Sequence, residues 1–130
     1  MNNLTHLTLS WSVSKGRDTY GYNICHLDDG NTGKRYKCLG GGYDMTGTVF
    51  GDWLKDVYQA ELQAHRHVVT GMYGARSKDD GSVSLDGAYG FECMLDIARV
   101  IGLDVEREYV KKGVNRGNTI GWYVAPAAKE

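Results

Sequence analysis

A run of three glycines, Gly40 to Gly42, leads through Tyr43 and Asp44 into a predicted helix. A helix N-terminus presents unpaired backbone N–H groups, and glycines let a ligand approach the backbone, as in many phosphate sites. The segment lacks the Lys-Ser/Thr of a Walker loop, and Asp44 puts a negative charge where a phosphate would lie. We therefore interpret Gly41, Gly42 and Tyr43 as a turn between a strand and a helix, with nucleotide binding as the alternative.

Two groups of cations are the other candidate binding residues. The first borders the predicted N-terminal hairpin and is interleaved with tyrosines: Arg17, Tyr20, Tyr22, Lys34, Arg35 and Lys37. The second lies in the last predicted loop: Lys111, Lys112 and Arg116. Aromatic rings beside cations on a sheet are typical of single-strand or RNA binding, and they also suit protein–protein surfaces. The alternative is a solvated strand face whose cations discourage aggregation.

We expect the partner on the first group, because its strands carry more cations than packing requires and free charges can steer a partner. If that face is only solvated surface, binding is expected at the loop from Lys111 to Gly117.

The histidines and cysteines follow no catalytic or metal-binding pattern. The His-x-His pair at residues 65–67 meets no zinc spacing, and no nucleophile signature surrounds Cys25, Cys38 or Cys93. Cys93 falls near the apolar stripe of a predicted helix, where we expect a small buried hydrophobe. Cys25 and Cys38 lie on the two arms of one predicted hairpin, where they could be cross-strand neighbours without being bonded. The histidines and cysteines therefore predict no enzymatic activity, no metal site and no cofactor.

The composition is that of one globular domain spanning residues 1–130. Hydrophobic residues make up 42% and charged residues 24%, which excludes wholesale disorder. The net charge of −1 argues against a general nucleic-acid coat protein but allows a local basic patch. Three cysteines do not make a secreted disulfide scaffold. No signal-peptide pattern and no apolar run of about 18–20 residues is present, so a cytoplasmic protein without a membrane span is expected.

Alternation of apolar and polar residues predicts the strands that hold these candidates. Residues 7–13 alternate strictly, and residues 20–27 and 35–39 are rich in strand formers, which indicates a three-stranded meander. Residues 105–109 and 120–124 predict a closing hairpin. A further short strand is expected within His65–Ala75, with Val69, Gly71 and Tyr73 on one face.

Two apolar stripes of helical period predict two amphipathic helices, from Met45 to about Tyr58 and from about residue 91 to 101. Trp53 lies in the middle of the first stripe and is expected in the core. Gly47 and Gly51 share one face of that helix, which favours close packing of another backbone there. The predicted fold is α+β, with an antiparallel sheet (N-terminal meander plus C-terminal hairpin) packed against two helices.

Two segments resemble parts of short phage and prophage accessory proteins of unassigned function. They are Ser12-Val13-Ser14-Lys15-Gly16-Arg17 and Gly40 to Met45, the latter followed by the helix to about Tyr58. In those proteins a Ser-rich cationic hairpin precedes a Gly-x-Gly-(Tyr or Met)-Asp-Met segment and an apolar helix. The resemblance covers less than half of the chain. It implies a virus or mobile-element origin and supplies no catalytic residue.

These observations predict a non-enzymatic phage binding protein in the host cytoplasm that inhibits a host defence complex, in the manner of an anti-CRISPR protein. The expected partner is a host protein or ribonucleoprotein complex, with nucleic acid as a second candidate. The alternatives are a nucleotide-binding or nucleotide-sequestering protein that uses the glycine-rich helix starts, and a small enzyme built on the cysteines and histidines. The sequence leaves the oligomeric state open.

Overall fold

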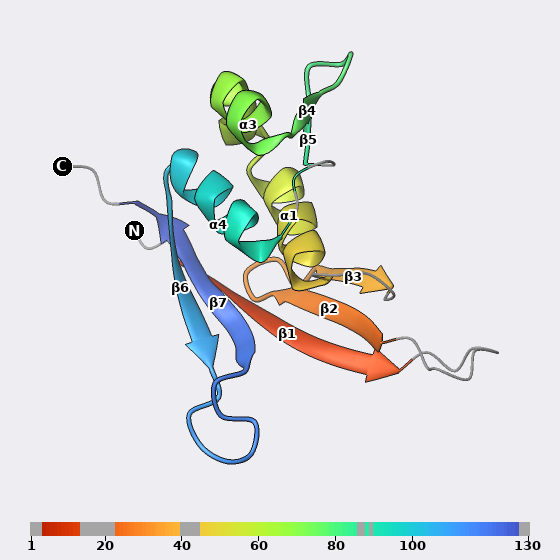
Figure 1. The fold of residues 1–130 in the computed structure, drawn as a ribbon, viewed down its shortest axis with the longest axis vertical. Coiled ribbons are helices and arrows are strands. Elements are labelled where there is room, and N and C mark those ends of the chain that lie inside the picture. Colours follow the sequence, from red (N-terminus) through yellow and green to blue (C-terminus); the bar gives the residue numbers. More distant parts are fainter. Residues whose placement is uncertain (1–3, 14–22, 40–44, 86–87, 89, 128–130) are drawn as a thin grey trace.

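The main sheet is antiparallel and has five strands in the order β3-β2-β1-β7-β6 (Figure 1). Its strands are β1 (Thr5–Val13), β2 (Asn23–Asp29), β3 (Arg35–Leu39), β6 (Leu103–Tyr109) and β7 (Thr119–Pro126). The computed structural model describes residues 4–13, 23–39, 45–85, 88 and 90–127. The α+β class, the N-terminal meander and the closing hairpin are confirmed.

Strand β1 joins the two predicted parts of the sheet, because it pairs with β2 on one side and with β7 on the other. Leu7 lies opposite Asp29 of β2 and opposite Trp122 of β7. Gly121 lies opposite Thr8, where a Cβ atom would overlap the carbonyl oxygen of Leu7. Only glycine therefore permits this close β1–β7 pairing.

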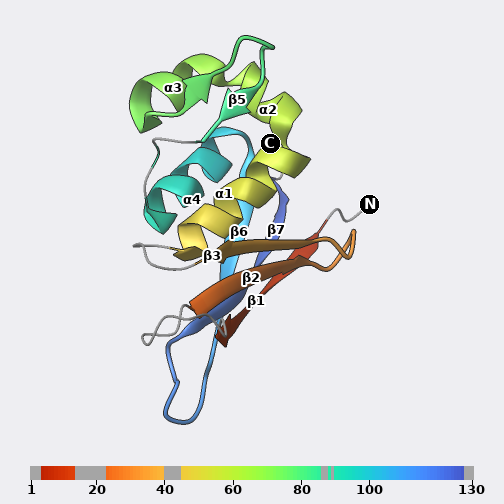
Figure 2. The same cartoon turned by 90° about the vertical axis from the view of Figure 1, so that its right-hand side faces the viewer.

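The described residues form four helices and one small hairpin. The helices are α1 (Met45–Val57), α2 (Gln59–Ala64), α3 (Arg66–Tyr73) and α4 (Phe91–Val100), and the hairpin consists of β4 (Arg76–Ser77) and β5 (Val83–Ser84). Helices α1 and α4 lie against one face of the sheet, α1 over β2 and β3 and α4 over β6. Helix α3 and the β4–β5 hairpin lie at the end of the molecule beyond them (Figure 2).

The strand expected within His65–Ala75 is wrong, because α3 occupies most of this segment. Val69 and Tyr73, which alternation placed on one face, are also four residues apart and so share a helical face. Val69 is fully buried, whereas Gly71 is exposed. Gly74 ends the helix in the left-handed region, with φ of 78°. Burial of Val69 in the core thus favours a helix over a strand in this segment.

Aromatic side chains fill the core between α1 and the sheet. The rings of Phe50 and Trp122 lie edge to face with centroids 5.3 Å apart, and Trp53 is fully buried, as predicted. The close packing expected at Gly51 involves a side chain rather than a backbone. A Cβ there would lie 3.1 Å from Sδ and Cε of Met94, because α4 crosses α1 at this glycine.

Candidate functional site

The first predicted cation group is partly neutralised in the structure. Arg17, Tyr20 and Tyr22 lie outside the described residues. Arg35 on β3 forms a bidentate ion pair with Asp28 on the neighbouring strand, through Nε at 2.6 Å and Nη2 at 2.9 Å. The hydrogen bonds from this guanidinium hold the pKa of Asp28 below its usual range.

Lys34 is tied to helix α1. Its Nζ donates to Oδ2 of Asp56 at 2.7 Å, and the Tyr36 hydroxyl donates to the same oxygen at 2.5 Å. These two donors lower the pKa of Asp56, while burial and the Asp56 hydrogen bond raise the pKa of Tyr36. Of the three described cations in this group, Lys37 alone has no carboxylate of a described residue within ion-pair distance. Two of the three described cations expected to steer a partner are therefore paired with carboxylates within the protein.

The sheet face opposite the helices carries a polar cluster that sequence analysis did not identify. His6 Nε2 lies 2.7 Å from Oε1 of Glu108, and the His6 ring stacks on Tyr123 with centroids 4.4 Å apart. The Tyr123 hydroxyl donates to Oε2 of Glu108 at 3.2 Å. The hydrogen bond from His6 is the largest cause of the lowered pKa of Glu108. Only the pairing of β1, β7 and β6 brings these three residues together.

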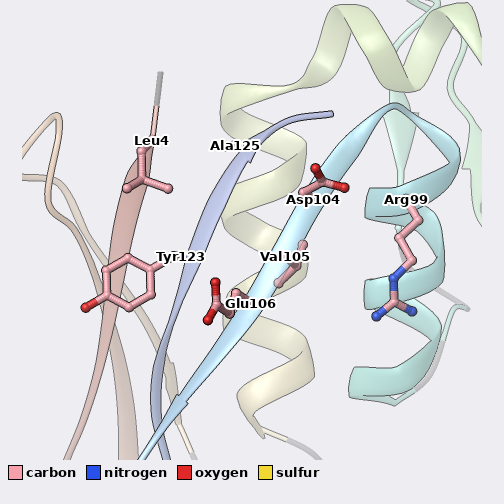
Figure 3. A pocket seen from close by; sticks show the side chains of 7 residues that line it. All are labelled: Leu4, Arg99, Asp104, Val105, Glu106, Tyr123 and Ala125. Atoms are coloured by element: carbon pink, nitrogen blue, oxygen red, sulfur yellow. The ribbon is translucent and has the colours of Figure 1, made fainter. Parts of the chain in front are cut away.

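Next to this cluster lies a shallow pocket of about 380 Å³ whose lining has two carboxylates and one guanidinium group (Figure 3). Asp104 and Glu106 of β6 line it together with Tyr123 and with Arg99 of α4. The alternation of acidic residues along β6 is the sequence signal that could have located it. Its carboxylates make this part of the surface unfavourable for a polyanion.

The β6–β7 arm, which we define as residues 107–120, projects away from the helices (Figures 1 and 2). Backbone hydrogen bonds between Val110 and Asn118 (2.9 Å), and between Gly117 and Val110 (2.8 Å), close its loop. Gly113 and Gly117 have φ values of 94° and 92°, which favour glycine. The arm therefore has a defined backbone.

The arm carries the second predicted cation group, Lys111, Lys112 and Arg116. All three are exposed, and no carboxylate among the described residues lies within ion-pair distance of them. The arm's one carboxylate, Glu108, is held by the His6 cluster. The structure thus leaves a concentrated positive charge on the arm.

Apolar and aromatic side chains accompany these cations. Val114 in the arm's loop is fully exposed, and Tyr109 and Ile120 are 45% and 38% exposed at its base. The Arg107 guanidinium lies 5.2 Å from the centre of the Tyr109 ring and donates to the Gly117 carbonyl, which braces the loop. The arm can therefore offer charge and apolar contact together.

The described residues contain no group of three or more His, Cys, Asp or Glu side chains that could hold a metal ion. Among the helices that the structure describes, none is long and apolar enough to cross a membrane. Gly41, Gly42 and Tyr43, the secondary candidates at the first helix start, lie outside the described residues.

Comparison with known proteins adds no functional assignment. No protein-family model matches the chain, and neither a curated protein nor a solved structure matches it. The geometry of the β6–β7 arm is the observation on which a functional proposal can rest.

Proposed function

We propose that this chain is a non-enzymatic binding protein of a phage or mobile element, and that its β6–β7 arm binds the phosphates of a host nucleic-acid-handling complex. The observation that carries the proposal is a group of exposed cations on a projecting hairpin (Figure 1), Lys111, Lys112 and Arg116, with no described carboxylate at ion-pair distance. Lysine and arginine side chains that contact phosphates release condensed counterions, which is the main source of affinity for nucleic acids.

The shape of the arm supports the same interpretation. A two-stranded ribbon is narrow enough to enter the major groove of DNA, and an exposed residue such as Val114 can contact bases or sugars there. The acidic side chains of β6, Asp104 and Glu106, repel phosphates from the neighbouring sheet face. Opposite charges on arm and sheet would orient the protein with the arm foremost.

The finer part of the proposal, inhibition of a host defence complex in the host cytoplasm, rests on the resemblance to phage accessory proteins. An arm that binds the phosphates of a nucleic-acid-guided complex would block that complex without any catalytic step. Inhibition of this kind requires no cofactor and no metal, and its partner is the host ribonucleoprotein.

Nucleotide binding at a glycine-bearing helix start remains the alternative proposal. At the second such start, Gly90 precedes α4 with φ of 92°, but the first turn of the helix carries Glu92. A carboxylate at that position competes with a phosphate for the positive end of the helix. Glu92 therefore counts against nucleotide binding at this helix start, whereas the cations of the arm favour binding of a macromolecule.

A matched pair of variants tests the proposal. The arm variant changes Lys111, Lys112 and Arg116 to glutamine, and the control variant changes Arg66, Arg76 and Lys78, exposed cations of α3 and the β4–β5 hairpin at the other end of the molecule. Fluorescence anisotropy measures binding to a short DNA duplex and to the RNA duplex of the same sequence at several salt concentrations. Both variants lose the same net charge.

The arm variant is expected to bind at least about tenfold more weakly, with the slope of log K against log salt reduced by about two to three, since each lost phosphate contact removes about 0.9. The control variant is expected to bind like the unmodified protein. Equal losses in both variants would show that only the overall charge matters. Absence of binding by the unmodified protein at low salt would contradict the proposal.

A further inference from the structure

Cys25 and Cys38 lie directly opposite each other on the paired strands β2 and β3. Both are thiols. Residues that are register partners in an antiparallel pair project from the same face of the sheet, with Cβ atoms about 4.5–5.5 Å apart. The two cysteine side chains are therefore neighbours on one face of a hairpin whose loop spans only a few residues.

The backbone hydrogen bonds of the hairpin define the geometry of this pair more closely. The Asp29 N–H donates to the Lys34 carbonyl at 2.9 Å, so this pair and every second pair along the hairpin are hydrogen-bonded pairs. The next hydrogen-bonded pair is Leu27 with Tyr36, and the one after it is Cys25 with Cys38. The Cα atoms of hydrogen-bonded pairs lie about 5.5 Å apart, within the range of about 4.4–6.8 Å that disulfides span.

A disulfide needs Cβ atoms about 3.5–4.5 Å apart, so the strands must approach by roughly 1 Å. Among the described strands, β3 lies at the edge of the sheet and pairs only with β2, so this approach disturbs the pairing of no further strand there. Cys38 is partly exposed, whereas Cys25 is buried. Of the two residues, Cys38 is therefore the more accessible to a soluble oxidant.

The surroundings disfavour the thiolate form of both cysteines. Burial, and to a lesser extent the neighbouring Cys38, raise the pKa of the Cys25 thiol to about 11. Burial also raises the pKa of Cys38. The thiolate form is the reactive one, so both groups react slowly at neutral pH.

We propose that Cys25 and Cys38 form a modification site at which hydrogen peroxide produces an intramolecular disulfide. The Cys38 thiolate attacks one peroxide oxygen, the O–O bond breaks, and a first water leaves once its oxygen is protonated, so that Cys38 becomes a sulfenic acid. Cys25 then gives up its proton and attacks the Cys38 sulfur, the S–O bond breaks, and a second water leaves. The peroxide accepts the two electrons that the thiols lose. This inference is independent of the proposed binding function.

The third cysteine provides a clean background for the test. In the full chain with Cys93→Ser, only the proposed pair remains. The protein is treated with hydrogen peroxide, denatured, alkylated with iodoacetamide and weighed by intact-mass spectrometry. The matched control carries Cys38→Ser in addition, a change at a partly exposed position, and circular dichroism checks that both variants are folded.

The expected result is a monomer that has lost two hydrogens, takes up no alkyl group, and regains two alkylatable thiols after treatment with dithiothreitol. The control should lose no hydrogens and take up one alkyl group at Cys25. The proposal is overturned if both thiols stay alkylatable, if oxidation yields only disulfide-linked dimers, or if Cys38 gains oxygen atoms while Cys25 remains a thiol.

Discussion

The indole Nε1 of Trp53 donates a hydrogen bond of 2.8 Å to Oδ2 of Asp29, and both side chains are buried. The other carboxylate oxygen accepts the backbone N–H groups of Asn31 at 2.7 Å and Thr32 at 3.1 Å. One carboxylate thus connects helix α1 to the turn between β2 and β3. A buried charge is tolerated in a core only when it is hydrogen-bonded in this way.

Replacing Trp53 should separate the contribution of this hydrogen bond from that of the ring. Trp53→Ala is expected to lower the free energy of unfolding by about 3–5 kcal/mol, as loss of a large core side chain does. Trp53→Phe keeps an aromatic ring but leaves Asp29 without one donor, at a cost of about 1–3 kcal/mol. Urea unfolding measures both. A Trp53→Phe variant as stable as the unmodified protein would show that the hydrogen bond contributes nothing.

Gly121→Ala should disrupt the junction between the two parts of the sheet. The added methyl group would overlap the Leu7 carbonyl oxygen, and overpacking of this kind costs about 1–3 kcal/mol or more. Gly71→Ala in α3 is the matched control, because nothing lies within 4 Å of its added Cβ and alanine favours a helix by about 1 kcal/mol. Thermal melts should move in opposite directions for the two variants. A neutral Gly121→Ala would contradict the β1–β7 register.

Acid should destabilise the protein through carboxylates that accept hydrogen bonds in the folded state. The pKa values of Asp28, Asp56 and Glu108 are lowered by Arg35, by Lys34 with Tyr36, and by His6. A lowered folded-state pKa adds stability above the unfolded-state value of about 4, and this stability is lost as pH falls through the folded-state value. We expect the urea concentration at the unfolding midpoint to decrease when the pH is lowered below about 4.

Asp56→Asn tests that assignment, since it removes one of these titrating groups and keeps the side chain's size. The variant should be less stable than the unmodified protein at neutral pH, by a small amount because the pair is exposed, and should lose less stability on acidification. Parallel pH profiles for the two proteins would show that Asp56 does not contribute.

Local patterns in the sequence were sufficient for most of the fold. The alternation around Leu7 and Leu9 and the helical stripe around Trp53 depend on neighbours within one element, so the periods identify a strand and a helix and also their buried faces. The same patterns placed Cys25 and Cys38 on one hairpin. They failed at α3, where Val69 and Tyr73 satisfy both periods and tertiary packing selects the helix.

The candidate site depended on contacts that no local pattern contains. Lys34 and Lys111 have the same charge and similar polar surroundings in the sequence, yet Lys34 meets Asp56, which is 22 residues away, and Lys111 meets no described carboxylate at ion-pair distance. Whether a cation is available to a partner is set by which carboxylates the fold brings within reach. Residue types and spacing therefore determined the elements and the candidate cations, whereas only the packing of α1 on the sheet and the projection of the β6–β7 arm decided which of those cations stay unpaired.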